Sequence, residues 1–416
     1  MSDKKTILPN LRFEEFNHYP KWEITTLGEI SEPVDEKVGQ RNCILMSVTA
    51  GKGLVPQKEK FGREIAGNSY KNYYVIREND FAYNKSATKQ FPEGYIAILS
   101  DYPEAALPNS IFTCFRITAE DCIPAFVNQL FQSNFHGKWL RKYIEVGARA
   151  HGSLNVDCNH LWSMPIALPK KKEQEKIAEV LTGIDKLIRN EITKLEYLRK
   201  QKKGLLQKLF PSDEKSFPEF RFKEFKSKDM KFQTGDKLFE PVSNRNHKCD
   251  LPVLAISQEH GAIPRDKIDY NVFVSEKSLE SYKVVEIGDF IISLRSFQGG
   301  IEYSAYHGIC SPAYIILRRK TDICDQYFRY YFKSPKFIQD LNKNLEGIRD
   351  GKMVSYSQFS ELLLPVPDVK EQQKVAECLI SVDELIRGQE AKVENLQAHK
   401  EGLVQQLFPS FEEVFK

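Results

Sequence analysis

Two stretches of the chain, residues 168–212 and 366–410, repeat the same alternation of apolar and polar positions. Steps of four and three residues, counted from Ile177 in the first stretch and from Val375 in the second, fall mostly on apolar side chains. These positions are Ile177, Leu181, Ile184, Ile188, Glu191, Leu195, Leu198, Lys202, Leu205 and Leu209, then Val375, Leu379, Val382, Ile386, Gln389, Val393, Leu396, Lys400, Leu403 and Leu407. This spacing is typical of a coiled-coil seam, so each stretch predicts one helix about 55 Å long.

The polar exceptions fall at equivalent places in the two seams. If the helices pair antiparallel, Glu191 can lie opposite Lys400, and Lys202 opposite Gln389. The first stretch has an excess of Lys and Arg, whereas the second has an excess of Asp and Glu. Opposite charge favours pairing of the two stretches with each other over pairing of either with itself.

A second repeat precedes each predicted helix. The segment LPNLRFEEF at 8–16 returns as FPEFRFKEF at 217–225, so the duplication includes the globular part of the chain. Short runs rich in β-branched and aromatic residues follow each copy and predict strands at 43–48, 73–76, 81–83, 96–99, 111–117, 251–256, 283–285, 290–294, 301–305 and 313–317. Amphipathic stretches at 125–143 and 324–345 carry aromatic residues at helical intervals, which we expect in the core.

These patterns predict an α+β fold. Two mixed α/β domains are separated by two long helices that pair as an antiparallel coiled coil, with a pseudo-twofold internal repeat. The predicted segments are a first globular domain at 1–168, the first long helix at 169–212, a second globular domain at 213–365, and the second long helix with the C-terminal tail at 366–416.

Composition favours a protein of the cytoplasm. The 416 residues are 41% hydrophobic, enough for more than one core, and the net charge of +3 does not by itself indicate nucleic acid. The eight cysteines never fall in a C-x-x-C pair, so we expect buried free thiols in a reducing compartment. No apolar run suits a signal peptide or a membrane helix, and we expect no membrane association.

Catalytic signatures are absent from the sequence. It has no GxxxxGK[ST] phosphate loop, no GxGxxG after a predicted strand and no histidine pair at i, i+4 spacing. Residues 311–314, Ser-Pro-Ala-Tyr, resemble in part the Asn/Ser/Asp-Pro-Pro-aromatic loop of amino-methyltransferases, but the second proline is missing. We therefore expect a protein that is not an enzyme, with no catalytic residues, no metal and no cofactor.

Basic and polar residues in loops remain, and they suit DNA. Arg149 and Arg349 lie in loops flanked by glycine, where an arginine can approach guanine O6 and N7 in the major groove. Other candidates end strands at matching positions of the two halves or precede the turns at Gly53 and Gly261. The predicted DNA-binding set is Lys52, Lys85, Ser86, Lys89, Arg149, His151, Ser153, His260, Arg295, Ser296, Gln298, Arg349 and Lys352. Each alone could be an ordinary solvated side chain; recurrence in both halves favours the DNA interpretation.

Each long helix begins with the pattern P-x-x-x-E-Q-x-K-[IV]-A-E-x-L-x-x-[IV]-D-x-L-I. With this pattern and the two segments at 8–16 and 217–225, the chain resembles, over essentially its whole length, the DNA-specificity subunits of type I restriction-modification enzymes. The resemblance implies a non-catalytic subunit in which each variable target-recognition domain reads one half of a bipartite target in double-stranded DNA. It also implies that the helices set the half-site spacing and bind two methyltransferase subunits, and that restriction/translocase subunits join the complex.

The same resemblance suggests which helix residues contact those partners. The implied subunit-interface residues are Glu173, Gln174, Asp185, Arg189, Glu371, Gln372, Asp383 and Arg387. An alternative from another class of protein stays open, namely a coiled-coil scaffold whose two variable domains bind protein partners.

Overall fold

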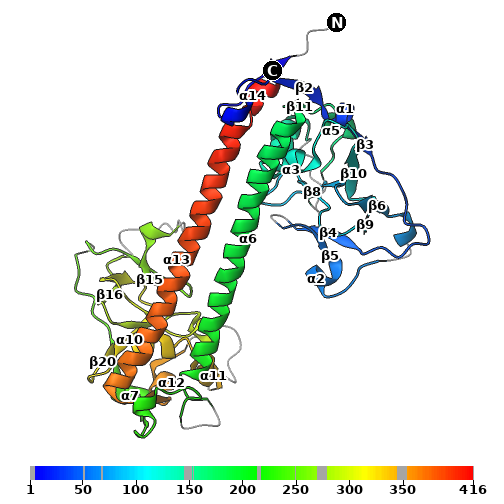
Figure 1. Cartoon of the computed structure of the whole chain (residues 1–416). Coiled ribbons are helices and arrows are strands. Elements are labelled where there is room, and N and C mark those ends of the chain that lie inside the picture. The colour runs from blue at the N-terminus through cyan, green and yellow to red at the C-terminus, as the bar shows by residue number, and fades with distance from the viewer. Residues whose placement is uncertain are drawn as a thin grey trace. The chain divides into compact units, whose positions relative to one another are not determined.

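The structure is a computed structural model that describes residues 5–49, 52–66, 69–144, 152, 154–212, 217–248, 250–268, 279–343 and 354–415. The chain forms two compact units. The first unit comprises Met1–Ile192 and Lys392–Lys416, and the second unit comprises Thr193–Ala391. Each unit therefore contains a globular part and a share of both long helices, which are the green and the orange-to-red ribbons of Figure 1.

Both predicted long helices are present, as α6 (Lys171–Lys208) and α13 (Val369–Leu407). Asp368 caps α13, because its Oδ1 accepts the backbone N–H of Lys370 at 3.0 Å. Each helix ends a few residues before a proline, Pro211 or Pro409, which cannot continue the hydrogen-bond ladder.

In the first unit, ion pairs join α6 to α13. Asp185 pairs with Lys400 and Glu191 with Lys392, each at 2.6 Å. Residue numbers rise along α6 while they fall along α13, so these two helix segments run in opposite directions.

The second unit repeats this arrangement with Lys202 and Asp383 at 2.6 Å and with Arg199 and Glu390 at 2.7 Å. The predicted register is therefore wrong. Lys400 pairs with Asp185 instead of Glu191, and Lys202 pairs with Asp383 instead of Gln389. For Lys202 the observed partner is a carboxylate, which is a stronger partner for an ammonium group than the amide of Gln389.

Among the described residues of the first unit, the strands form antiparallel sheets. The largest has the order β3-β10-β7-β8, beside β1-β2-β11 and the pairs β4-β5 and β6-β9. These strands are β1 (Thr6–Ile7), β2 (Trp22–Thr26), β3 (Ser31–Pro33), β4 (Met46–Thr49), β5 (Gly53–Pro56), β6 (Tyr74–Arg77), β7 (Phe81–Asn84), β8 (Tyr95–Ile98), β9 (Glu104–Leu107), β10 (Phe112–Ile117) and β11 (Pro165–Leu168).

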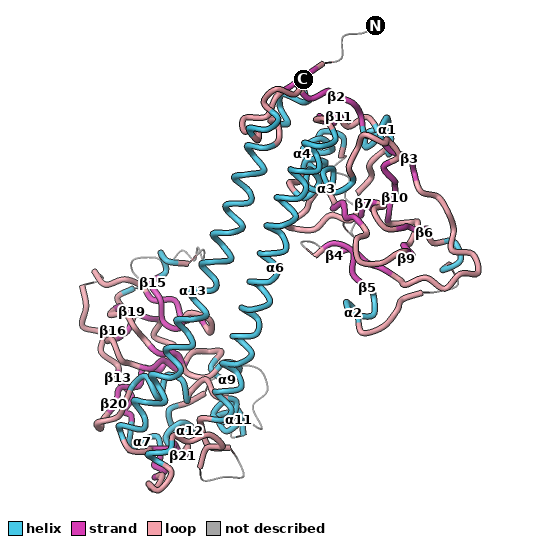
Figure 2. The backbone as a smooth tube through the Cα atoms, in the orientation of Figure 1, coloured by secondary structure: helices cyan, strands magenta, loops and turns pink. Residues whose placement is uncertain are grey.

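The second unit repeats this order as β13-β20-β17-β18, with the pairs β12-β21, β14-β15 and β16-β19. Its strands are β12 (Lys231–Thr234), β13 (Phe239–Val242), β14 (Leu254–Ser257), β15 (Gly261–Pro264), β16 (Lys283–Val285), β17 (Phe290–Ile292), β18 (Glu302–Tyr303), β19 (Gly308–Cys310), β20 (Ile315–Arg319) and β21 (Leu363–Val366). The duplication thus extends from the long helices to the sheets, drawn as magenta segments in Figure 2.

Every predicted strand is found close to its expected place, but several strands were not predicted. Six of these contain a proline and lie at a sheet edge, where the missing N–H breaks no ladder. They are β3, β5, β11, β13, β15 and β21, with Pro33, Pro56, Pro165, Pro241, Pro264 and Pro365.

The predicted helix at 125–143 divides into α3 (Pro124–Gln132) and α4 (Phe135–Leu140), because Asn134 adopts a φ of 58° between them. The predicted helix at 324–345 divides into α10 (Asp325–Tyr331) and α11 (Pro335–Lys343) at a proline, which suits a helix start. The predicted aromatic core is confirmed; its buried members are Phe126, Phe131, Phe135, Trp139, Tyr327, Phe328, Tyr330, Tyr331, Phe332 and Phe337. The remaining described α-helices are α1 (Leu27–Ile30), α2 (Gln57–Phe61), α5 (Cys158–Trp162), α7 (Gly235–Leu238), α9 (Ser296–Gly299), α12 (Tyr356–Ser360) and α14 (Phe411–Phe415).

A buried arginine–glutamate pair joins the start of each long helix to the segment that opens the same half of the chain. Arg12 donates to both carboxylate oxygens of Glu173, at 2.8 and 2.6 Å. Arg221 donates to both carboxylate oxygens of Glu371, at 2.7 and 2.8 Å. Trp22 adds a hydrogen bond from its Nε1 to Glu173. Both arginines come from the repeated segments at 8–16 and 217–225, so this pair gives those segments a structural role.

The C-terminal helix α14 packs on α4 of the first unit. Phe415 makes ring contacts with Phe135 and Trp139, 5.1 and 5.0 Å between centroids. At the equivalent places in α11, the second unit has Lys336 and Asp340, which form an ion pair at 2.6 Å. The second unit is therefore charged where the first unit offers an apolar surface to α14.

The described cysteines are free thiols, as predicted, and Cys249 lies outside the described residues. Burial raises the pKa of Cys122 and of Cys310 to about 12, which disfavours the reactive thiolate form at neutral pH. Across the described parts of the chain, no helix combines the length and the apolar character that a membrane span requires.

We expect Arg221→Ala to destabilise the chain by about 3–5 kcal/mol, because it leaves the Glu371 carboxylate buried without a counter-charge. Urea unfolding of the full chain measures this loss. Lys374→Ala is the matched control, since its ion pair with Glu224 is exposed to solvent and should contribute little to stability. Equal losses of unfolding free energy in the two variants would show that the buried pair stabilises the chain no more than the exposed pair does.

We expect Lys202→Glu to lower the melting temperature of the full chain, because it places a carboxylate beside Asp383. Adding Asp383→Lys should recover part of the loss, whereas adding Gln389→Lys, which the sequence-based register favours, should recover none. Since both partners of this ion pair are partly exposed, the effect is about 1 kcal/mol. Lys186→Glu, an exposed charge reversal on the same helix, is the control. Recovery by Gln389→Lys would contradict the observed register.

Candidate nucleic-acid interface

In the second unit, three predicted DNA-binding residues lie on two segments that contact each other. His260 is in the turn between β14 and β15. Arg295 directly precedes α9, and Gln298 lies within α9. Gln258 links the segments, because its Nε2 donates to the backbone oxygen of Arg295 at 3.0 Å. All four side chains are exposed. The hairpin turn and the end of β17 thus form one polar surface.

Side chains from elsewhere in the second unit hold the backbone of α9 in place. Lys333 Nζ donates to the Gly299 oxygen at 2.9 Å, and Asn342 Nδ2 donates to the Phe297 oxygen at 2.6 Å. Lys333 is itself paired with the buried Glu302. Burial lowers the pKa of Lys333 and raises the pKa of Glu302, while their attraction opposes both shifts. The segment that carries Arg295 and Gln298 is therefore rigidly supported.

Ser296 does not fit its predicted role as a DNA contact. It is 1% exposed, and its Oγ accepts the backbone N–H of Ser293 at 2.8 Å. The hydroxyl closes the turn that begins α9, so it faces the interior of its unit. The sequence pattern could not separate this turn-forming serine from a solvent-facing one, because serine is common in both settings.

In the first unit, the end of β7 meets the segment that follows the predicted loop at 147–153. The backbone oxygen of Lys85 accepts the N–H of Leu154 at 2.8 Å, and the N–H of Ala87 donates to Gly152 at 2.6 Å. Lys85 and Ser86 are half-buried, whereas Lys52 and Lys89 are exposed.

Several predicted residues lie outside the described parts of the chain. They are Arg149, His151, Ser153, Arg349 and Lys352. Their proposed contacts with DNA stay predictions from the sequence.

Four of the predicted subunit-interface residues are buried within their own unit. Glu173 and Glu371 hold the arginine pairs described above. Gln174 Oε1 accepts the N–H of Ile123 at 2.8 Å, and Gln372 Oε1 accepts the N–H of Cys324 at 2.9 Å. All four are at most 2% exposed. The repeated Glu-Gln pair therefore fastens each helix to its own globular part and does not offer a surface to another subunit, which corrects the prediction.

The predicted interface residues Asp185 and Asp383 are half-buried and engaged within the chain. Besides its lysine, Asp185 accepts a hydrogen bond from Gln129 Nε2 at 3.1 Å. Asp383 accepts one from the Tyr330 hydroxyl at 2.7 Å. Both carboxylates thus connect the helices with each other and with the core.

Arg189 and Arg387, the last two predicted interface residues, are exposed on α6 and α13. Leu187 and Leu385, two positions before them, are 42% and 60% exposed. These four residues occupy equivalent places on the two helices, one pair in each unit.

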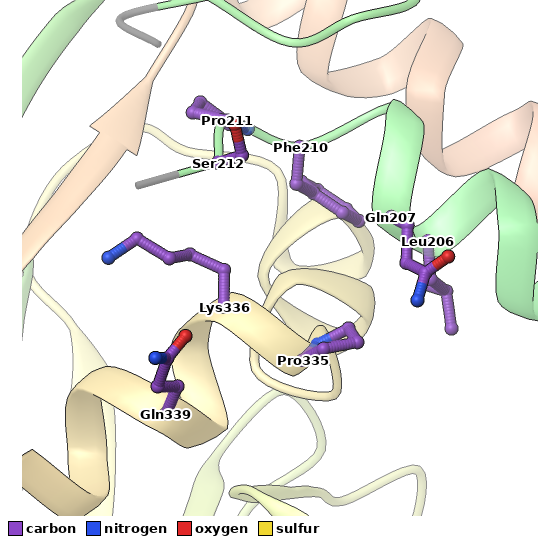
Figure 3. A pocket seen from close by; sticks show the side chains of 8 residues that line it. All are labelled: Leu206, Gln207, Phe210, Pro211, Ser212, Pro335, Lys336 and Gln339. Carbon is purple, nitrogen blue, oxygen red and sulfur yellow. The ribbon is translucent and has the colours of Figure 1, made fainter. Parts of the chain in front are cut away.

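A pocket in the second unit is lined by none of the predicted site residues. Figure 3 shows its lining, which comes from the end of α6 and from α11 and includes Phe210, Pro335, Lys336 and Gln339. No cluster of metal-ligating side chains occurs in the parts of the chain that the structure describes.

Comparison with known proteins finds similarity to one family. Residues 219–395 match the family model described as the type I restriction modification DNA specificity domain. Over 95% of its length, the chain is 26% identical to the protein of Methanocaldococcus jannaschii named as the MjaX specificity subunit of a type I restriction enzyme, 96% of which is covered. The predicted resemblance to type I specificity subunits is thereby confirmed.

Two solved structures share the fold. The S subunit of a type I restriction-modification system from M. genitalium gives a TM-score of 0.56 at 16% identity, covering 97% of this chain and all of that one. A chain from a study of complex assembly and conformational transition in the type I R-M system gives a TM-score of 0.54 at 16% identity, covering 94% and 98%.

Proposed function

We propose that this chain is the non-catalytic sequence-specificity subunit of a type I restriction-modification complex, in which each globular part reads one half of a bipartite target in double-stranded DNA. One observation carries the proposal. The largest sheets of the two units have the same strand order, yet the units expose different polar residues at equivalent turns, Lys52 in one and His260 in the other. A shared frame with different exposed residues is what two readers of different half-sites require.

The division of the chain into 1–168, 169–212, 213–365 and 366–416 keeps its functional meaning in this proposal. The globular segments are target-recognition domains, and α6 with α13 forms an antiparallel coiled coil between them. Related by a pseudo-twofold axis, the domains would face half-sites in opposite orientation. Helices of about 55 Å can separate half-sites that are about 34 Å, or one DNA turn, apart.

Binding and chemistry are divided between subunits in this proposal. Lysine and arginine contacts with phosphates position the chain and make its affinity depend on salt, while a few side chains in the major groove choose the sequence. Two methyltransferase subunits bind the helices, and two exposed pairs, Leu187 with Arg189 on α6 and Leu385 with Arg387 on α13, support one such contact in each unit. The partner supplies the cofactor and flips out the base that it modifies.

Restriction/translocase subunits complete the complex when cleavage accompanies methylation. The chain itself then needs no cofactor, and its place is the cytoplasm, where the DNA and these partners are. The alternative, a coiled-coil scaffold whose variable domains bind proteins, differs in having no affinity for duplex DNA.

Mapping methylated bases in cells with and without this chain tests the proposal. We expect a split motif, with two short specific parts and a fixed unspecified gap, that disappears on deletion. A catalytically inactive methyltransferase partner serves as the second arm, because it should abolish the same motif while the chain is still present. If the assembled complex shows no affinity for any duplex, the scaffold alternative stands instead.

We expect Arg149→Ala and Arg349→Ala each to weaken binding of the complex to its specific duplex by about 1–3 kcal/mol, because a bidentate contact with guanine is lost. Titration against specific and random duplexes at one salt concentration measures this. Equal losses on both duplexes would make these arginines phosphate contacts instead of base readers.

A further inference from the structure

The turn of the β14–β15 hairpin carries an exposed side chain whose position is nevertheless fixed. Gln258 lies in solvent, but its Nε2 donates to the Arg295 oxygen at 3.0 Å. The neighbouring Gly299 leaves room for it, since a Cβ built there would lie 2.6 Å from the Gln258 side chain. An exposed glutamine ordinarily samples many rotamers, and this one is held against a backbone carbonyl.

The carbonyl that holds Gln258 belongs to the supported segment described above. Lys333 and Asn342 fix the backbone oxygens of Gly299 and Phe297. The Arg295 oxygen also accepts the N–H of Gln298 at 2.9 Å. The amide of Gln258 is therefore oriented by a segment that is itself rigid, which lowers the entropy lost when the amide binds a ligand.

The groups left on Gln258 match one base. The Arg295 oxygen uses one of the two hydrogens on Nε2, and Oε1 has no hydrogen-bond partner among the residues that the structure describes. One donor hydrogen and one acceptor oxygen remain on the planar amide. Adenine presents the complementary pair in the major groove, an acceptor at N7 and a donor at N6.

We propose that Gln258 is a specificity-determining residue of the second unit that reads an adenine through two hydrogen bonds in the major groove. This inference rests on the proposed function. Arg295 is exposed beside it and can contact a neighbouring guanine or phosphate.

The proposed adenine contact involves only the half of the target that the second unit reads. Both hairpins close on a glycine with positive φ, Gly53 and Gly261, and three residues separate the strands in each. The first hairpin has Ala50 where the second has Gln258, so the sequence offers no amide at that place in the first unit.

The test uses the full chain assembled with its methyltransferase partner. The methylated motif is mapped for the wild type, Gln258→Ala, Gln258→Glu and the neighbouring control Glu259→Ala. For Gln258→Ala we expect the same split motif and gap, with one A·T position in one half-site relaxed by about tenfold in methylation rate. Gln258→Glu should shift that position toward cytosine, whose N4 donates to a carboxylate.

Duplexes with 7-deazaadenine provide a second readout, in which the contact is removed from the DNA side. Replacing N7 at each adenine in turn should slow methylation by the wild-type complex about tenfold at one position, and Gln258→Ala should show no further loss there. An unchanged motif for Gln258→Ala, or equal sensitivity of wild type and variant at every adenine, would overturn the role of Gln258. Absence of any split motif with the wild-type chain would instead overturn the proposed function.

Discussion

The buried pairs of Arg12 with Glu173 and Arg221 with Glu371 are the interactions on which each unit depends. A carboxylate removed from water is costly unless its counter-charge is fixed in position, and here the guanidinium donates to both oxygens. Each pair ties the segment that opens a half of the chain to the first turn of its long helix. The pair therefore fixes the first turn of the helix against the globular part that precedes it.

The rest of the duplicated frame extends this connection. Gln174 and Gln372 bind backbone groups just ahead of α3 and α10, and Asp185 and Asp383 bind a lysine from the other helix. Asp80 and Asp289 repeat the principle within the sheets, each paired with an arginine of the neighbouring strand at 2.6–2.7 Å. The residues that the two halves share are therefore mostly structural, whereas the exposed turns differ. This division lets one frame carry two different recognition surfaces.

Some features of the structure could be predicted from the sequence, and others could not. The seam from Ile177 to Leu209 and the aromatic core followed from periodicity, because burial of an apolar stripe requires it. Register did not follow, since Lys400 can reach several carboxylates and only the packed helices select Asp185. The orientation of Gln258 depended on Arg295, which is distant in sequence. The role of Ser296 depended on a local turn with Ser293 that the sequence pattern does not distinguish from an exposed serine.

The sequence by itself determined the two long helices, the duplication, the positions of the main strands and the resemblance to specificity subunits, because local periodicity and repeated motifs express all of these. Only the tertiary structure decided that Glu173, Gln174, Glu371 and Gln372 are buried and make contacts within their own unit, and that they are not available to partner subunits. It also decided that a hairpin turn and the end of another strand form one surface in the second unit. The physical reason is the same in each case: burial and hydrogen-bond partners arise from segments brought together in space, and a pattern along the chain does not specify which segments meet.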